Sequence, residues 1–296
     1  MTDPINFDID SLVVRYQLHP ERRDVFVEGN QDQGLVRTFV EKYGDENISV
    51  FSISVVNVSA HLIEARSLPR RSRRSEVITL AFELESKGVP PRQAACIADA
   101  DFEYLLPRGL RCSLLLLTDF TSMELYAFFD EALHRVLILV SPNTSYAGAT
   151  LLADLTGPLQ FLFSALATNV DLRLGLEWID SVEKFFGISG GRIQFDGQEF
   201  MKRYLVDRVP AGEVQRFTAR FDEIQSMLSS SVRCRIRGHD FIRVLTWYLK
   251  KVEGGKHLQQ ESVRQMLYAT LRPDDLAGHP MFSSLLGRLG SPALRH

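Results

Sequence analysis

Short apolar runs alternate with amphipathic segments along the first 140 residues of the chain. Segments 32–44 and 75–88 carry apolar side chains at helical spacing, and each ends at a glycine, which favours helix termination. Continuous apolar strands separated by helices are typical of a parallel sheet that is covered on both faces, which predicts an α/β fold. The runs that we expect to form its strands are residues 24–28, 48–53, 94–99 and 112–118.

The pattern changes after this region. Residues 119–175 are expected to be mostly helical, and 184–197 to form a hairpin that turns at Gly190 and Gly191. We therefore expect a catalytic α/β domain at 1–140 and a mainly helical C-terminal region at 141–296. Further helices are expected at 198–206, 212–229, 239–252 and 259–270.

Composition and charge exclude little. Apolar residues make up 45% of the 296 residues and charged residues 24%, as in ordinary folded proteins, and the net charge of −3 neither indicates nor excludes a nucleic-acid binder. Cys96, Cys112 and Cys234 show no zinc or disulfide spacing, which favours the cytoplasm. The apolar runs at 113–117 and 136–140 are too short to cross a bilayer, so no membrane is expected.

An apolar stretch at 146–167 is unusually rich in large aliphatic side chains for an exposed helix. We expect it to be buried, and a homodimer would provide the cover.

Five arginines lie within nine residues of the segment "ARSLPRRSRRSE". Proline and serine around them indicate an exposed loop. Two interpretations stay open, a solvated loop and a surface that contacts phosphates. The arginines are Arg66, Arg70, Arg71, Arg73 and Arg74.

Carboxylates follow two of the predicted strands. Glu28 ends the first strand, and Asp99 and Asp101 follow the third. Ligands of open parallel sheets bind beyond the carboxyl ends of the strands, so these acids would meet if the two strands are neighbours. Such a cluster repels itself, and a divalent cation such as Mg²⁺, which prefers oxygen ligands, would relieve the repulsion.

The segments "VFVEGNQD" and "CIADAD" resemble the Toprim domain of topoisomerases, bacterial primases and OLD-type nucleases. The resemblance implies that Glu28 is a general acid or base and that Asp99 and Asp101 bind Mg²⁺, with Mn²⁺ as the alternative. It also implies that Glu28 contributes to the metal site. Gly29 would let the backbone approach a phosphate.

Two further segments extend the resemblance. "LLLLTDFTSMELYAF" (114–128) and "RIRGHDFIRVL" (235–245) are similar to motifs of small Toprim effectors in the PARIS anti-phage defence system. This similarity implies that Glu124 is another acid of the metal site. His239 lies at a helix start preceded by Arg235 and Arg237, which indicates a contact with a phosphate or the catalytic pocket. The similarity further implies a toxic nuclease that cleaves RNA, in particular tRNA, and is controlled by an ABC-type ATPase partner.

Alternative interpretations remain open. Glu124 could simply favour the dipole of a helix start, His239 could belong to a helix N-terminus, and Glu103 could be a further ligand or a solvated side chain. The protein could instead be an OLD-like DNA endonuclease or a regulatory subunit that does not cut. A receiver-type phosphoacceptor is a further alternative, but 136–145 lacks the expected lysine. "GISGG" lacks the P-loop lysine, so ATP would be bound by a partner.

Overall fold

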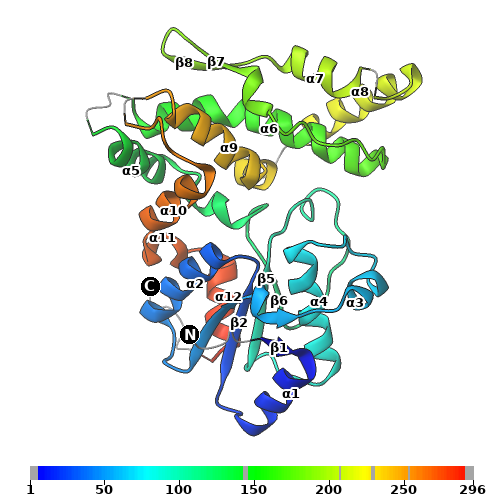
Figure 1. The fold of residues 1–296 in the computed structure, drawn as a ribbon, viewed down its shortest axis with the longest axis vertical. Coiled ribbons are helices and arrows are strands. Elements are labelled where there is room, and N and C mark those ends of the chain that lie inside the picture. The colour runs from blue at the N-terminus through cyan, green and yellow to red at the C-terminus, as the bar shows by residue number, and fades with distance from the viewer. Residues whose placement is uncertain (1–5, 143–145, 207, 228–230, 253, 291–296) are drawn as a thin grey trace. The chain divides into compact units, whose positions relative to one another are not determined.

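A four-stranded parallel sheet lies at the centre of the N-terminal part of the chain (Figure 1). The computed structural model describes residues 6–142, 146–206, 208–227, 231–252 and 254–290. All three strand pairs of this sheet are parallel. The strands, in order across the sheet, are β3 (Ile48–Ser52), β2 (Arg23–Val27), β5 (Ala94–Ala98) and β6 (Leu115–Leu117). The expected α/β fold with a parallel sheet is confirmed.

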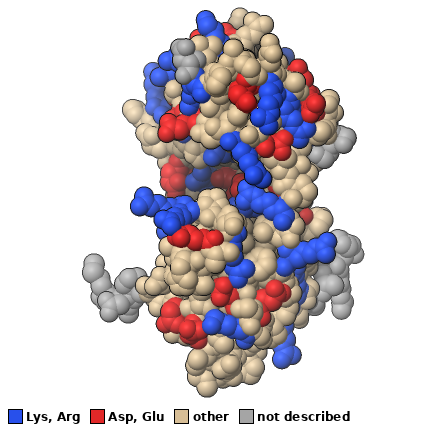
Figure 2. All heavy atoms as spheres, turned by 90° about the vertical axis from the view of Figure 1, so that its right-hand side faces the viewer, with Lys and Arg blue, Asp and Glu red and all other residues tan. Residues whose placement is uncertain are grey.

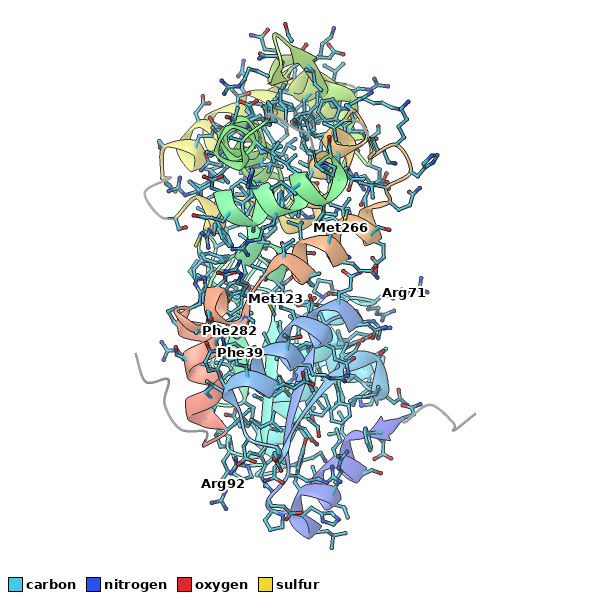
Figure 3. All side chains as sticks on the ribbon, turned by 90° about the vertical axis from the view of Figure 1, so that its left-hand side faces the viewer. Phe39, Arg71, Arg92, Met123, Met266 and Phe282 are labelled. Carbon is cyan, nitrogen blue, oxygen red and sulfur yellow. The ribbon has the colours of Figure 1, made fainter. Side chains whose placement is uncertain are left out.

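Helices cover both faces of the sheet (Figure 1). On one face, Phe39 of α2 packs against Phe282 of α12 with ring centroids 4.6 Å apart (Figure 3). On the other face, α1 and α4 share an apolar core with β2 and β5. The helices of this part are α1 (Ile9–Leu18), α2 (Asn30–Tyr43), α3 (Ala60–Ala65), α4 (Arg73–Ser86), α11 (Pro273–Ala277) and α12 (Pro280–Arg288).

A short second pair of strands accompanies this sheet. β1 (Phe7–Asp8) pairs in parallel with β4 (Val56–Asn57), and the 3₁₀ turn η1 (Ile53–Val55) leads from β3 into β4. Gly88, which follows α4, has a φ of 77°, a left-handed conformation that glycine adopts without steric cost. The glycine stop expected for this helix is therefore confirmed.

The middle of the chain is mainly helical, as expected. Two strands form a separate antiparallel hairpin, β7 (Phe186–Ser189) and β8 (Arg192–Phe195). Its turn residues Gly190 and Gly191 both have positive φ, which explains the two glycines. The helices are α5 (Asp130–Val140), α6 (Gly148–Leu172), α7 (Gly197–Leu205), α8 (Ala211–Ser226), α9 (Gly238–Leu249) and α10 (Gln260–Thr270). The 3₁₀ turns are η2 (Met123–Ala127), η3 (Val182–Phe185) and η4 (Val232–Arg235). The end expected for the 212–229 helix lies outside the described residues.

The chain divides into two compact units, and the division differs from the one expected at residue 140. Helix α5 precedes residue 140 but packs on α6, so it belongs to the second unit. Helices α11 and α12 come last in the chain but pack on α2 and β6, so they belong to the first unit. The first unit comprises the described residues of Met1–Ala100, Pro107–Asp119 and Leu271–His296, and the second those of Asp101–Leu106 and Phe120–Thr270.

Helix α6 has the length and composition to span a bilayer, judged over the described residues. Its most apolar window has a mean hydropathy of 1.3, and 44% of that window is buried inside the protein. Leu151, Leu155 and Leu159 are fully buried within the second unit, where α6 packs on α5 and α8. A place in the core of this unit thus accounts for the apolar character of α6, and the homodimer stays a prediction.

Candidate functional site

Glu28 and Asp99 meet at the carboxyl edge of the parallel sheet. They directly follow β2 and β5, which are hydrogen-bonded neighbours. The backbone N–H of Asp99 donates to Oε1 of Glu28 at 2.8 Å, and both residues are half-buried. We expected Glu28 and Asp99 to meet if their strands are neighbours, and β2 and β5 are neighbours in the sheet.

The turn that carries Asp99 is anchored through its backbone. The carbonyl of Asp99 accepts from Nε of Arg74 at 2.6 Å, and the N–H of Ala100 donates to Oγ1 of Thr118 at 3.0 Å. Thr118 directly follows β6, the strand beside β5. Side chains of Glu28, Arg74 and Thr118 therefore hold the backbone of Asp99 and Ala100 in place without a ligand.

Asp101 belongs to the second unit, since the chain passes from one unit to the other after Ala100. Its side chain is exposed, and its N–H donates to the carbonyl of Thr121 at 2.8 Å. Its φ of 48° lies in the left-handed region, which aspartate tolerates better than most residues. The structure thus brings Glu28 and Asp99 together and gives Asp101 its own anchor two residues on.

No group of three or more His, Cys, Asp and Glu side chains in the described part of the chain has an arrangement that could hold a metal ion. Glu28 and Asp99 still supply the donor chemistry that Mg²⁺ takes from proteins, which is one or two carboxylates with water completing the shell. The Mg²⁺ or Mn²⁺ requirement therefore stays a prediction that rests on this pair of carboxylates.

Gly29 caps the N-terminus of α2. Its N–H donates to Oδ2 of Asp32 at 3.0 Å, and an added Cβ would lie 3.1 Å from that same oxygen. Its φ of −129° is open to any residue, so the close carboxylate accounts for the glycine. At Gly29, where we expected the backbone to approach a phosphate, the N–H is thus engaged by Asp32 in this structure.

The arginine-rich segment differs from the expected exposed loop. Helix α4 begins at Arg73, and the side chain of Arg74 is 7% exposed. Arg71 is exposed, with a φ of 58°, and stands out from the surface (Figure 3). Three arginines of the segment form ion pairs with glutamates, namely Arg66 with Glu83 at 2.8 Å, Arg70 with Glu64 at 2.7 Å and Arg73 with Glu76 at 2.9 Å.

Acidic side chains therefore offset much of the charge of this segment. Figure 2 faces the side on which α3 and α4 lie in Figure 1, and there Lys and Arg are interspersed with Asp and Glu. The segment therefore does not form a continuous cationic surface, which is the usual basis of non-specific nucleic-acid binding. The phosphate-contacting role of Arg70, Arg71 and Arg73 remains a prediction.

Glu124 and the "RGHD" segment meet within the second unit. The carboxylate of Glu124, 12% exposed, forms an ion pair with Nε of Arg264 at 3.0 Å. Gly238, the first residue of α9, has no room for a side chain, because a Cβ would lie 2.0 Å from Oγ of Ser122 and 2.5 Å from Oε2 of Glu124. The two motifs singled out from the sequence thus form one packed contact, although they lie more than 100 residues apart in the chain.

His239 and Asp240 have different environments at the start of α9. Asp240 is 1% exposed and accepts from Nε1 of Trp178 at 3.3 Å, and burial raises its pKa. His239 is exposed, yet desolvation together with Arg237, Arg243 and other nearby charges lowers its pKa to about 4. Its imidazole is therefore neutral at pH 7 and offers a phosphate no positive charge, which weakens the phosphate-contacting interpretation.

Two residues at the edge of the sheet have structural roles that the sequence did not predict. Arg74 holds the backbone of Asp99 instead of facing solvent. Asp119 accepts from the N–H of Met281 at 3.0 and 3.2 Å, so it caps α12. The only local signal for the second contact is Pro280 at the first position of a helix whose own N-cap residue, His279, provides no side-chain cap.

A scan against protein-family models found no family that matches this chain, and a search of curated proteins found no match.

Proposed function

We propose that this protein is a metal-dependent phosphodiesterase of the Toprim class that acts as an endonuclease. One observation carries the proposal, the 2.8 Å hydrogen bond that joins Asp99 to Glu28 at the carboxyl edge of adjacent parallel strands. Open parallel sheets bind their ligands at this edge, and the order Glu-Gly, then Asp-x-Asp, is the one that the Toprim resemblance requires.

The roles of the acids follow from their chemistry. Asp99 and Asp101 would hold Mg²⁺, and Glu124 is expected to join them on the strength of the sequence similarity. When bound, the cation would supply positive charge against the scissile phosphate. Glu28 would take a proton from the attacking water or return one to the leaving oxygen, which is general acid–base catalysis.

The substrate and partners are proposed from the resemblance to the PARIS effectors. The protein would cleave RNA, with tRNA favoured, in the cytoplasm of a phage-infected cell. An ABC-type ATPase would hold this toxic activity in check, in keeping with the missing P-loop lysine of "GISGG". A homodimer would present two sites to one folded nucleic acid.

The test is a cleavage assay with purified protein on tRNA and duplex DNA, with and without Mg²⁺. Glu28→Gln keeps a side-chain oxygen that can accept from Asp99 but removes the proton acceptor, so cleavage should fall at least 100-fold. Glu46→Gln is the matched control, because Glu46 is an exposed residue of the same unit.

Cleavage that needs Mg²⁺ and is lost only in Glu28→Gln would support the proposal, and the preferred substrate would separate the RNase from the OLD-like DNase. Equal cleavage by both variants would remove Glu28 from the mechanism. If neither nucleic acid is cut, the assay is repeated with the co-expressed ATPase, and inactivity there would favour a regulatory subunit.

A further inference from the structure

Arg74 is a buried cation at the start of α4. Only 7% of its surface is exposed, and its neighbours Ser75 and Val77 are also buried on this helix. Burying a guanidinium group is costly unless polar partners compensate it. Helix α4 packs on β5, and the buried Arg74 at its start needs polar partners there.

Arg74 donates a hydrogen bond to the candidate site. Nε of Arg74 donates to the carbonyl of Asp99 at 2.6 Å, a short, charge-assisted bond. The N–H of the same Asp99 donates to Glu28 at 2.8 Å. Both backbone polar groups of Asp99 are thus held by side chains from different elements, which restricts where its carboxylate can lie.

The neighbouring arginines do something else. Arg66, Arg70 and Arg73 each bind a glutamate at or near the surface, and Arg74 donates to the backbone carbonyl of Asp99. Arg74 therefore differs from the other arginines of the segment in its burial and in its hydrogen bond to the backbone of Asp99.

We propose that Arg74 is a positioning residue that orients Asp99 for cation binding and does not contact the nucleic acid. The inference rests on the proposed function, since it assigns Asp99 to the metal. It separates Arg74 from the phosphate-contacting role that its sequence neighbourhood suggests. A residue that orients a metal ligand changes metal affinity and turnover, whereas a phosphate contact changes substrate affinity and its salt dependence.

The test compares Arg74→Lys and Arg74→Gln with Arg92→Lys, a matched exchange at an exposed arginine of the same unit that has no role in the proposed site. Lysine keeps the charge but cannot place a donor where Nε lies, and glutamine removes the charge. Calorimetry measures Mg²⁺ and Mn²⁺ affinity, thermal unfolding without metal reports the fold, and cleavage assays give kcat and KM.

Loss of a partner that orients a metal ligand typically costs 10- to 100-fold in affinity, so we expect about that loss in both Arg74 variants. We expect kcat to fall with it, KM for nucleic acid and its salt dependence to stay constant, and Arg92→Lys to match the wild type. Unchanged metal affinity in folded Arg74 variants would overturn the inference, as would a rise in KM alone. Loss of the fold in both variants would also overturn it, because Arg74 would then be a structural residue of α4.

The wild-type protein separates this inference from the proposed function. If the wild type binds neither cation and cuts nothing alone or with the ATPase, the proposed function fails. If the wild type binds and cuts while the Arg74 variants bind equally well, the positioning role alone fails.

Discussion

Asp24 is a buried carboxylate in the core of the first unit, and it is the second residue of β2. It is fully buried, and neither oxygen has a hydrogen-bond partner among the described residues. Its nearest cation is Arg15, whose NH2 lies 3.7 Å away. Burial raises the pKa of Asp24, and the opposing influence of Arg15 and Tyr16 does not cancel it. The carboxylate of Glu28, which follows the other end of β2, accepts a hydrogen bond from Asp99, so Asp24 is the costlier group.

The direction of this pKa shift sets a pH dependence. The folded state holds the Asp24 proton more tightly than the unfolded chain, so the free energy of unfolding should fall as pH rises from the unfolded pKa, about 3.9, through the folded pKa. Asp24→Asn removes this dependence. Urea unfolding of both proteins between pH 4 and 7 measures it, with Asp45→Asn as the control, because Asp45 has a lowered pKa. Parallel slopes for Asp24→Asn and the wild type would contradict the prediction.

At the scale of elements, the strands and their glycine stops were predictable because their signals are local. Continuous apolar runs marked β2 and β5, and the left-handed Gly88, Gly190 and Gly191 stand where the sequence indicated a stop or a turn. The start of α12 was not predictable in this way, since its cap is Asp119, 162 residues earlier in the chain. The meeting of Asp99 with Glu28 was expected only if their strands are neighbours, and the order of the strands in the sheet supplies that condition. The burial of Arg74 depends on how α4 packs.

The start of α9 depends on a glycine that has no room to change. In Gly238→Ala the new Cβ would overlap Ser122 and Glu124, both buried or nearly so, and such overpacking typically costs about 1–3 kcal/mol of stability. Gly212→Ala in the first turn of α8 is the matched control, because nothing lies within 4 Å of its added Cβ. That exchange should stabilise the protein by about 0.4–1 kcal/mol. A denaturant midpoint that rises in Gly238→Ala, as it should in Gly212→Ala, would show that α9 can move aside.

An ion pair ties the hairpin to α6 within the second unit. Asp154 of α6, with a side chain 4% exposed, accepts from Nε of Arg192 at 2.7 Å and from the N–H of Ile193 at 2.9 Å. Burial alone would raise the pKa of Asp154, but its hydrogen bonds, including one from Tyr146, outweigh burial and lower it. The carboxylate is therefore ionised and structural, which explains an acid in the most apolar helix of the described chain.

We expect Asp154→Asn to lower the free energy of unfolding by about 1–3 kcal/mol at pH 7, because a buried charged hydrogen bond is lost. Its folded pKa lies below the unfolded value, so the stabilisation is present above about pH 3.9 and is lost as pH falls through the folded pKa. The difference between variant and wild type should therefore shrink in acid. Thermal unfolding at pH 7 and pH 3 measures it, and Asp222→Asn on exposed α8 is the control. A difference that persists unchanged at pH 3 would show that the charge is not its source.

At the scale of the whole molecule, the order of elements in the chain does not follow the two units. All four strands of the first unit's main sheet end by Leu117, yet the helix that covers one face of it, α12, is the last in the chain. The sequence indicated a boundary at 140 because the apolar pattern changes there, and that pattern does not reveal that the chain returns. A contact between segments more than 200 residues apart leaves no local signal.

This return makes the sheet dependent on the end of the chain. Phe282 of α12 is fully buried against Phe39 of α2, so Phe282→Ala should lower the free energy of unfolding by about 3–5 kcal/mol, the usual range for a large core aromatic.

Ending the chain after Thr270 removes both α11 and α12 and should unfold the first unit, while the helices of the second unit keep their own core. Circular dichroism and hydrogen exchange measure both variants, because exchange resolves which strands lose protection. Fast exchange throughout the strands of the first unit, with protection kept in the second unit, is the expected result. Full protection of β5 in the shortened chain would show that the N-terminal strands and helices fold without the C-terminal pair, and the boundary near 140 would then describe the folding unit better than the contacts do.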